Sequence, residues 1–197
     1  MPDKSDKLLV LDLDETLIHA TSLPLAVPSD FLFDSYHVYR RPGLEQFLLN
    51  ISQHFTLGVW SSASDEYVEE IVKTITPDAI EWFLIWGRSR CTIKRDYNLD
   101  NYYFEKKLEK VKNKGFKLEQ VIIVDDSPEK ARSNYGNAVY IKPFEGNRED
   151  DEFLALQGVK LLFHRVGFII CQSYKLSYIS PHSALLSFTT QCFKCIR

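Results

Sequence analysis

The sequence predicts an α/β fold in which helices cover both faces of a doubly wound, Rossmann-like parallel sheet. Short continuous apolar runs recur along the chain, and segments with helical periodicity separate them. A run that is apolar at every position is typical of a strand buried on both faces, and such strands occur in parallel sheets. Strands that alternate with helices are joined by right-handed crossovers, which place helices on both faces of the sheet.

The expected strands and helices alternate in the order that this fold requires. The first apolar run is Leu8–Leu11, and similar runs occupy residues 55–60, 121–124 and 139–141. A last helix is expected from residue 150 to about residue 164. Three segments between the runs place apolar side chains on one helical face: Leu44, Phe47, Leu48 and Ile51; Tyr67, Val68, Ile71 and Ile75; and Phe104, Leu108 and Val111.

Two insertions border the crevice that such folds form beyond the carboxyl ends of their strands. Residues 21–41 contain prolines and the alternating stretch Tyr36-His37-Val38-Tyr39, which predicts a small hairpin. Residues 86–103 are too few for a cap domain. We therefore expect an open crevice in one domain over residues 1–164, with no large cap.

Residues 165–197 form an atypical C-terminal tail. They contain no acidic residue, and residues 176–193 contain no charged residue. Their Ser, Thr, Gln, His and Pro content makes them a poor membrane-spanning helix, so no stable membrane insertion is expected. The tail is either an added targeting or partner segment or the product of an altered reading frame, and the sequence does not decide between the two.

Charge and cysteine content limit the possible functions and the compartment. The formal net charge is -3, and all 27 acidic residues lie at or before Glu152. An acidic body argues against direct nucleic-acid binding, which requires a basic face. The four cysteines have neither metal-finger spacing nor a dense disulfide pattern, which indicates reduced thiols in an intracellular protein of the nucleus or cytoplasm. We expect a monomer.

The first polar cluster follows the first apolar run directly. Asp12 and Asp14 are two carboxylates spaced by one residue, with Thr16 two positions further. Their repulsion would be relieved by Mg²⁺, which suits carboxylate, carbonyl and water ligands. Asp12 could then attack phosphorus, while Asp14 protonates the leaving oxygen and later activates water. The alternative is that these residues only start the next turn.

Two further polar clusters follow other apolar runs. Ser61 and Ser62 come directly after Trp60, and a Ser61 hydroxyl could bind a phosphate oxygen near the start of the next helix. Asp125 and Asp126 follow the third run, where they could complete an oxygen shell around the cation. For Ser64 and Ser127 we expect the simpler role of capping helices.

A phosphoryl-transfer site also requires a fixed cation that stabilises the charge on the phosphate oxygens. Lys94, Lys106 and Lys107 are candidates by position. Most lysines in such segments are solvated, so the residue types alone do not choose among them.

Taken together, the motifs DLDETL at residues 12–17, WSSAS at 60–64 and DDSP at 125–128 resemble the signature of the haloacid dehalogenase superfamily. More narrowly, they resemble the branch of RNA polymerase II C-terminal-domain phosphatases and their NIF-domain relatives. The phrase YRRPGL at residues 39–44 is also similar to that branch. The resemblance covers residues 7–164 and does not extend to the tail.

The resemblance implies specific roles, residue by residue. Asp12 would be the nucleophile and Asp14 the acid and base. Magnesium would be held by Asp12, the main-chain carbonyl of Asp14, and Asp126 with Asp125 close by. Phosphate would be bound by Lys106, with Lys107 as the alternative, and by the hydroxyl of Ser61, near Ser62 and Thr16.

The predicted function is a magnesium-dependent phosphoserine or phosphothreonine protein phosphatase, with the RNA polymerase II C-terminal domain as one candidate substrate. An uncapped crevice would admit a chain-like substrate, and basic residues nearby could meet an acidic phosphopeptide. These basic residues are Arg88, Arg90, Lys94 and Arg95. They could equally form a solvated edge with no role in substrate binding. A small-molecule phosphatase and a phosphoprotein-binding regulator without turnover are the alternatives.

Overall fold

The computed structural model describes residues 6–96, 100–134, 136–154 and 156 and contains a central parallel sheet. Its strands lie in the order β10-β9-β1-β5-β6, which confirms the doubly wound class. Each neighbouring pair is parallel, and Leu11 pairs with Val59 on one side and Val124 on the other. The strands are β1 (Leu8–Leu11), β5 (Thr56–Trp60), β6 (Trp82–Trp86), β9 (Val121–Asp125) and β10 (Ala138–Tyr140).

Alternate residues of the strands supply two apolar layers, one on each face of the sheet, because successive side chains of a strand point in opposite directions. Leu9 and Leu11 belong to the layer that contacts α1 (Leu44–Ser52) and α2 (Asp65–Ile75). Leu8 and Val10 belong to the layer on the other face. That second layer is covered by short helical segments: η2 (Leu108–Lys114), η3 (Leu118–Gln120) and α3 (Pro128–Ala131).

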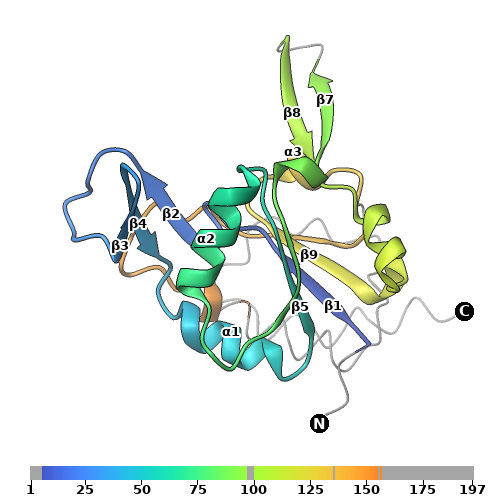
Figure 1. The fold of residues 1–197 in the computed structure, drawn as a ribbon, viewed down its shortest axis with the longest axis horizontal. Helices are drawn as coiled ribbons and strands as arrows, with labels where there is room; N and C mark the ends of the chain where they lie inside the picture. Colours follow the sequence, from blue (N-terminus) through green and yellow to red (C-terminus); the bar gives the residue numbers. More distant parts are fainter. Residues whose placement is uncertain (1–5, 97–99, 135, 155, 157–197) are drawn as a thin grey trace, which may run out of the picture.

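Two β insertions project from the body at separate places (Figure 1). The first is an antiparallel sheet of order β2-β4-β3, which confirms the predicted hairpin and extends it by a strand. The second is the antiparallel β7–β8 hairpin, which follows the short helix η1 (Arg88–Arg90). No cap domain occurs among the described residues. The strands are β2 (Ile18–Thr21), β3 (Phe31–Phe33), β4 (Tyr36–Arg40), β7 (Thr92–Asp96) and β8 (Asn101–Glu105).

One expectation about local structure was wrong, and one strand was missed. Phe104, Leu108 and Val111 do not share one helix, because Phe104 lies in β8 and pairs with Ile93 of β7. The helical turn begins only at Leu108, after the buried Lys106. The strand β6 was not predicted, although its five residues are all apolar. Cross-strand pairing in the hairpin therefore overrides the helical periodicity of this segment.

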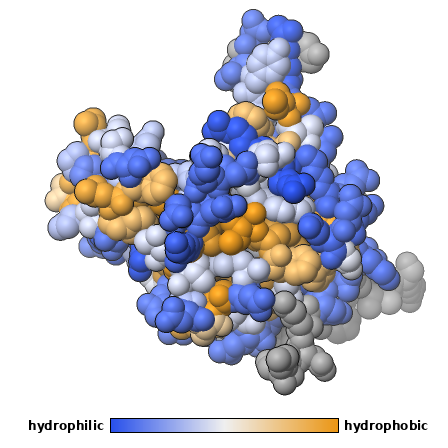
Figure 2. Space-filling view, in the orientation of Figure 1, coloured by the Kyte–Doolittle hydropathy of each residue, from blue (hydrophilic) through white to orange (hydrophobic). Residues whose placement is uncertain are grey.

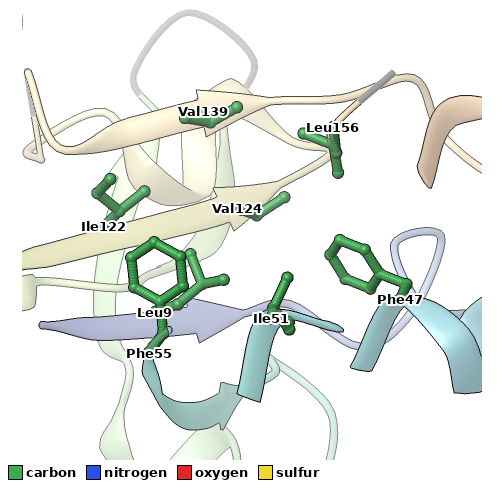
Figure 3. Close-up of a pocket in the computed structure, with 8 residues that line it drawn as sticks. All are labelled: Leu9, Phe47, Ile51, Phe55, Ile122, Val124, Val139 and Leu156. Atoms are coloured by element: carbon green, nitrogen blue, oxygen red, sulfur yellow. The ribbon is translucent and has the colours of Figure 1, made fainter. Parts of the chain in front are cut away.

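An apolar pocket lies between the sheet and α1, on the face that carries the first layer (Figure 3). No carboxylate or cation lines it, so it does not suit phosphate chemistry. Its lining residues are Leu9, Phe47, Ile51, Phe55, Ile122, Val124, Val139 and Leu156.

The end of the described chain contains part of the predicted last helix. Residues 152–154 and 156 are helical, and most of the remaining stretch to residue 164 lies outside the described residues, as does the tail over 165–197. Within the part of the chain that the structure describes, no helix combines the length and the apolar character needed to cross a membrane.

Candidate phosphoryl-transfer site

Three polar segments meet where neighbouring strands of the parallel sheet end. Asp12 follows β1, Ser61 follows β5, and Asp125 is the last residue of β9. Backbone hydrogen bonds continue the ladder into this edge, from Asp12 N–H to the Val124 carbonyl (2.9 Å) and from Ser61 N–H to the Trp86 carbonyl (2.9 Å). The predicted convergence of these segments is therefore present in the structure.

Three carboxylates form one cluster at this edge. Asp12, Asp125 and Asp126 each offer an oxygen, and these atoms lie within 4.8 Å of one another. The Oδ2 atom of Asp12 and the Oδ1 atom of Asp126 are buried and accept no hydrogen bond in the described part of the chain. Buried oxygens without a donor are costly unless a cation satisfies them. An all-oxygen donor set of this kind fits a hard divalent cation.

Burial and mutual repulsion act on the proton affinity of the cluster. Burial, followed by the charge of Asp12, raises the pKa of Asp125 above the ordinary range of an aspartate. The same two causes raise the pKa of Asp126. A metal ion bound between the three groups would oppose this effect, because a cation favours the charged form of a carboxyl group.

Lys106 is the lysine that the structure places beside the nucleophile candidate. Its Nζ atom lies 2.5 Å from Oδ1 of Asp12 and 2.7 Å from Oδ2 of Asp125, and its side chain is fully buried. Burial lowers the pKa of Lys106, but the charges of Asp12 and Asp125 outweigh it and raise that pKa above the usual value of a lysine. Lys107 is 33% exposed, and its amine lies 3.8 Å from Glu105 Oε2.

Backbone contacts hold Lys106 in this position. Its N–H donates to the Lys130 carbonyl at 2.7 Å, and its carbonyl accepts a hydrogen bond from the Asn134 amide. The segment after β8 is thus tied to α3 and to the turn behind it. Lys107, the next residue, is more exposed than Lys106, so the structure separates two lysines that are adjacent in the sequence.

Asp14 stands apart from the three-carboxylate cluster. Its Oδ1 accepts a hydrogen bond from the Tyr67 hydroxyl at 2.7 Å, and its Oδ2 accepts one from the Ser61 hydroxyl at 3.0 Å. Burial is the main cause that raises the pKa of Asp14, and the hydrogen bond from Tyr67 partly opposes it. A carboxyl group with a raised pKa beside a phosphate-binding hydroxyl is suited to proton transfer.

The other predicted hydroxyl residues have different surroundings. The Ser61 Oγ atom also accepts a hydrogen bond from the Ala63 N–H at 3.0 Å. The hydroxyl of Thr16 is buried without a hydrogen-bond partner in the described chain. Ser62 contributes its carbonyl, which accepts a hydrogen bond from Arg88 Nε at 2.8 Å. Among the predicted serine and threonine residues, Ser61 is therefore the one whose hydroxyl contacts Asp14.

The loop that carries Asp12 and Asp14 is held from behind by a buried arginine. Glu15 in this loop has a φ of 60°, a left-handed conformation that is uncommon for a residue with a side chain. Arg41 donates to the Thr16 carbonyl at 3.1 Å and forms an ion pair with Asp150 at 2.7 Å. A strained loop persists only when its surroundings hold it, and Arg41 supplies such a contact.

Sequence reasoning missed two residues of the site. Tyr67 was assigned only to the apolar face of a helix, yet its hydroxyl contacts Asp14. Lys130 lies in α3, and its Nζ atom is 4.0 Å from Oδ2 of Asp12. Neither residue belongs to a recognisable motif, so only the path of α2 and α3 past the strand ends could reveal them.

The basic residues near the site differ in how they are held. The guanidinium of Arg88 lies over the Phe104 ring at 5.0 Å and bonds to Ser62, so it is fixed at the rim of the site. Arg90 lies over the Trp86 ring at 5.8 Å. Arg95 is paired with Asp100 at 2.5 Å on the exposed hairpin. The rim therefore presents Arg88 more directly than Arg95.

Known proteins resemble this chain over most of its length. A CTD phosphatase-like protein of Invertebrate iridescent virus 3 is 29% identical over 182 residues, which cover 80% of this chain and 96% of the viral protein. CTD small phosphatase-like protein 2 of Dictyostelium discoideum is 30% identical over 75% of this chain. Nuclear envelope morphology protein 1 of Schizosaccharomyces pombe is 26% identical over 83% of it. The matched region spans only 26% of the Dictyostelium discoideum protein and 34% of the Schizosaccharomyces pombe protein.

Solved structures show the same fold. Fcp1, an essential RNA polymerase II CTD phosphatase, matches with a TM-score of 0.53 and 23% identity over 80% of this chain and 49% of that one. Fission yeast Fcp1 bound to beryllium fluoride matches with the same TM-score and 19% identity. The model of the NLI interacting factor-like phosphatase family matches residues 7–165. The chain therefore belongs to this phosphatase family, as the three sequence motifs indicated.

Proposed function

We propose that this chain is a magnesium-dependent phosphoprotein phosphatase that acts through an aspartyl phosphate. The main support for the proposal is the set of contacts around Asp12 at the strand ends. Lys106 holds one of its carboxylate oxygens, the other accepts no hydrogen bond, and two more carboxylates lie within reach of a shared cation. A buried carboxylate that is fixed by a cation, beside other carboxylates that could share a metal ion with it, is suited to attack on phosphorus.

In the first step, a carboxylate oxygen of Asp12 forms a bond to phosphorus and the bond to the ester oxygen breaks. The carboxyl proton of Asp14 passes to the leaving oxygen, so the alcohol departs neutral. The charge on the phosphate oxygens is stabilised by the Lys106 ammonium and the Ser61 hydroxyl. Lys130, with its amine 4.0 Å from Asp12, is a further cation within reach of the same phosphate.

In the second step, water attacks the phosphorus of the aspartyl phosphate and releases inorganic phosphate and the free Asp12 carboxylate. Asp14, now a carboxylate, accepts the proton of that water. The same residue therefore acts as acid and then as base. This exchange requires Asp14 to lie beside the phosphate rather than within the carboxylate cluster, which is its position next to Ser61.

Asp12, Asp125 and Asp126 are the side chains that would hold magnesium, with the main-chain carbonyl of Asp14 as the further ligand that the family resemblance implies. When bound, the ion neutralises charge on the transferring phosphoryl group. The buried oxygens without hydrogen bonds on Asp12 and Asp126 support this assignment.

The surface around the site supports a chain-like substrate. Figure 2 shows a largely hydrophilic β7–β8 hairpin and a gathering of apolar side chains over the β2–β4 sheet, two projections that Figure 1 places apart. Leu32, which is 63% exposed, belongs to the apolar sheet, and Arg88 lies at the base of the hairpin. A peptide could contact both, whereas a free sugar phosphate could not. The RNA polymerase II C-terminal domain is one candidate, since the relatives' names refer to that substrate.

Removal of divalent cations is expected to abolish phosphatase activity reversibly. Without the cation, the carboxylates at the site repel both one another and the incoming phosphate. The measurement is release of inorganic phosphate from p-nitrophenyl phosphate before chelation with EDTA, after chelation, and after addition of excess Mg²⁺. Full activity in EDTA would contradict the metal assignment while leaving Asp12 as a candidate nucleophile.

A purified phosphoserine peptide with acidic flanking residues is expected to be hydrolysed with a kcat/KM at least about tenfold above that of a free sugar phosphate or nucleotide, because it gains contacts outside the phosphate. Arg88→Gln is expected to raise the KM for the peptide and to leave p-nitrophenyl phosphate nearly unaffected. Arg95→Gln is the matched control, since that residue is engaged with Asp100. Faster hydrolysis of the sugar phosphate would favour the small-molecule alternative.

A further inference from the structure

Tyr67 makes a contact that neither the sequence motifs nor the proposed roles account for. It lies in the first turns of α2, and its hydroxyl donates a hydrogen bond to Oδ1 of Asp14 at 2.7 Å. Its ring is half-buried and meets the edge of Phe33 in β3, with ring centroids 5.3 Å apart. The side chain is thus held at its hydroxyl by Asp14 and at its ring by Phe33.

We infer that Tyr67 is a positioning residue that orients the Asp14 carboxyl group and stabilises the charge it acquires when it protonates the leaving oxygen. The inference rests on the proposed acid role of Asp14. Tyr67 donates to Oδ1 of Asp14 and Ser61 donates to Oδ2. When the one hydroxyl proton of Ser61 turns to a phosphate oxygen, Tyr67 remains the donor that holds the Asp14 carboxyl group.

The contribution of Tyr67 grows as the reaction proceeds. Before proton transfer, its hydroxyl donates to a neutral carboxyl group. As the proton moves from Asp14 to the ester oxygen, that group becomes a carboxylate, and the same hydrogen bond becomes charge-assisted and stronger. An interaction that is stronger in the transition state than in the ground state raises the rate.

This role predicts a dependence on the leaving group that a merely structural tyrosine would not show. A strongly basic leaving oxygen needs a proton as its bond to phosphorus breaks, whereas p-nitrophenolate departs without one. Phenyl phosphate and p-nitrophenyl phosphate are aryl esters of similar shape that differ in the basicity of the leaving oxygen. A comparison of the two esters therefore distinguishes an effect on protonation of the leaving oxygen from an effect on substrate binding.

The test is Tyr67→Phe, which removes the hydroxyl and keeps the ring contact with Phe33. We expect kcat/KM for phenyl phosphate to fall about tenfold to a hundredfold, the range for one hydrogen bond to a charged group, and kcat/KM for p-nitrophenyl phosphate to fall less than about threefold. The quantity compared is the ratio of the two values, since kcat/KM reports the step that expels the leaving group.

Tyr39→Phe is the matched control. It removes a more deeply buried hydroxyl, which accepts a hydrogen bond from the Leu25 N–H at 2.8 Å, and it should leave the ratio at its wild-type value. Thermal unfolding of both variants checks that each is folded. An unchanged ratio in Tyr67→Phe, with equal losses or none for both esters, would overturn the inference. Absence of hydrolysis by the wild-type protein would instead overturn the proposed function.

Discussion

Replacing Asp12 with asparagine is expected to abolish phosphate release and to prevent formation of any covalent phosphoenzyme. Asparagine has nearly the shape of aspartate, but its amide does not act as a nucleophile toward phosphorus. Loss of a nucleophile from such a site typically costs about 10⁴-fold or more in turnover. The measurements are release of inorganic phosphate from p-nitrophenyl phosphate and acid-quench trapping of radiolabelled phosphate on the protein.

The same substitution should leave the protein folded. Lys106 keeps its ion pair with Asp125 at 2.7 Å, and the repulsion between carboxylates at the site decreases. Asp78→Asn, in the exposed loop between α2 and β6, is the control with the same chemical change outside the site. Retained turnover in Asp12→Asn would exclude Asp12 as the nucleophile. Retained phosphopeptide binding without turnover in the wild-type protein would favour the regulator alternative.

Replacing Lys106 with methionine is expected to lower both turnover and stability. The side chain lies between two buried carboxylates, and methionine keeps its length while removing the charge. We expect kcat/KM to fall about 10²- to 10³-fold, as for loss of one preorganised donor to the transition-state charge. In the absence of metal, the free energy of unfolding should be about 3–5 kcal/mol lower than that of the wild type, because Asp12 and Asp125 lose their buried cation.

Added Mg²⁺ should restore more stability to Lys106→Met than to the wild-type protein, because a divalent cation can take over the neutralisation of the two carboxylates. Chemical denaturation with and without Mg²⁺ measures this difference. Lys107→Met is the matched control and should change neither quantity much, since that side chain is 33% exposed and contacts only Glu105 at 3.8 Å. Equal effects of the two substitutions on kcat/KM and on stability would contradict the assignment of Lys106 as the phosphate-binding lysine.

Much of the fold could be predicted from the chain because its central strands are almost entirely apolar. The runs at β1, β5 and β9 are buried at each residue, and this pattern indicates a parallel sheet without further information. The segment from β8 to η2 could not be read in this way, because Phe104 and Leu108 fit helical spacing as well as a strand followed by a turn. Pairing with β7 decided it, and that pairing is a contact between separate segments.

The candidate site follows the same division. Asp12, Ser61 and Asp125 were predictable because each lies at the carboxyl end of a buried strand, and parallel strands bring such residues to one edge. The sequence could not choose between Lys106 and Lys107, since one residue of register decides which amine turns inward. It gave no sign of Tyr67, whose apolar neighbours in α2 make it look like an ordinary core residue.

The amino-acid sequence by itself determined the parallel sheet, all of its strands except β6, and the meeting of acidic side chains at the strand ends, because these depend on periodicity and on local residue type. Only the tertiary structure decided which cation lies between the carboxylates, which hydroxyls contact Asp14, and which arginine supports the loop. Those choices depend on how hairpins and helices far apart in the chain are placed against the sheet. A difference of one position in that placement exchanges a buried side chain for an exposed one.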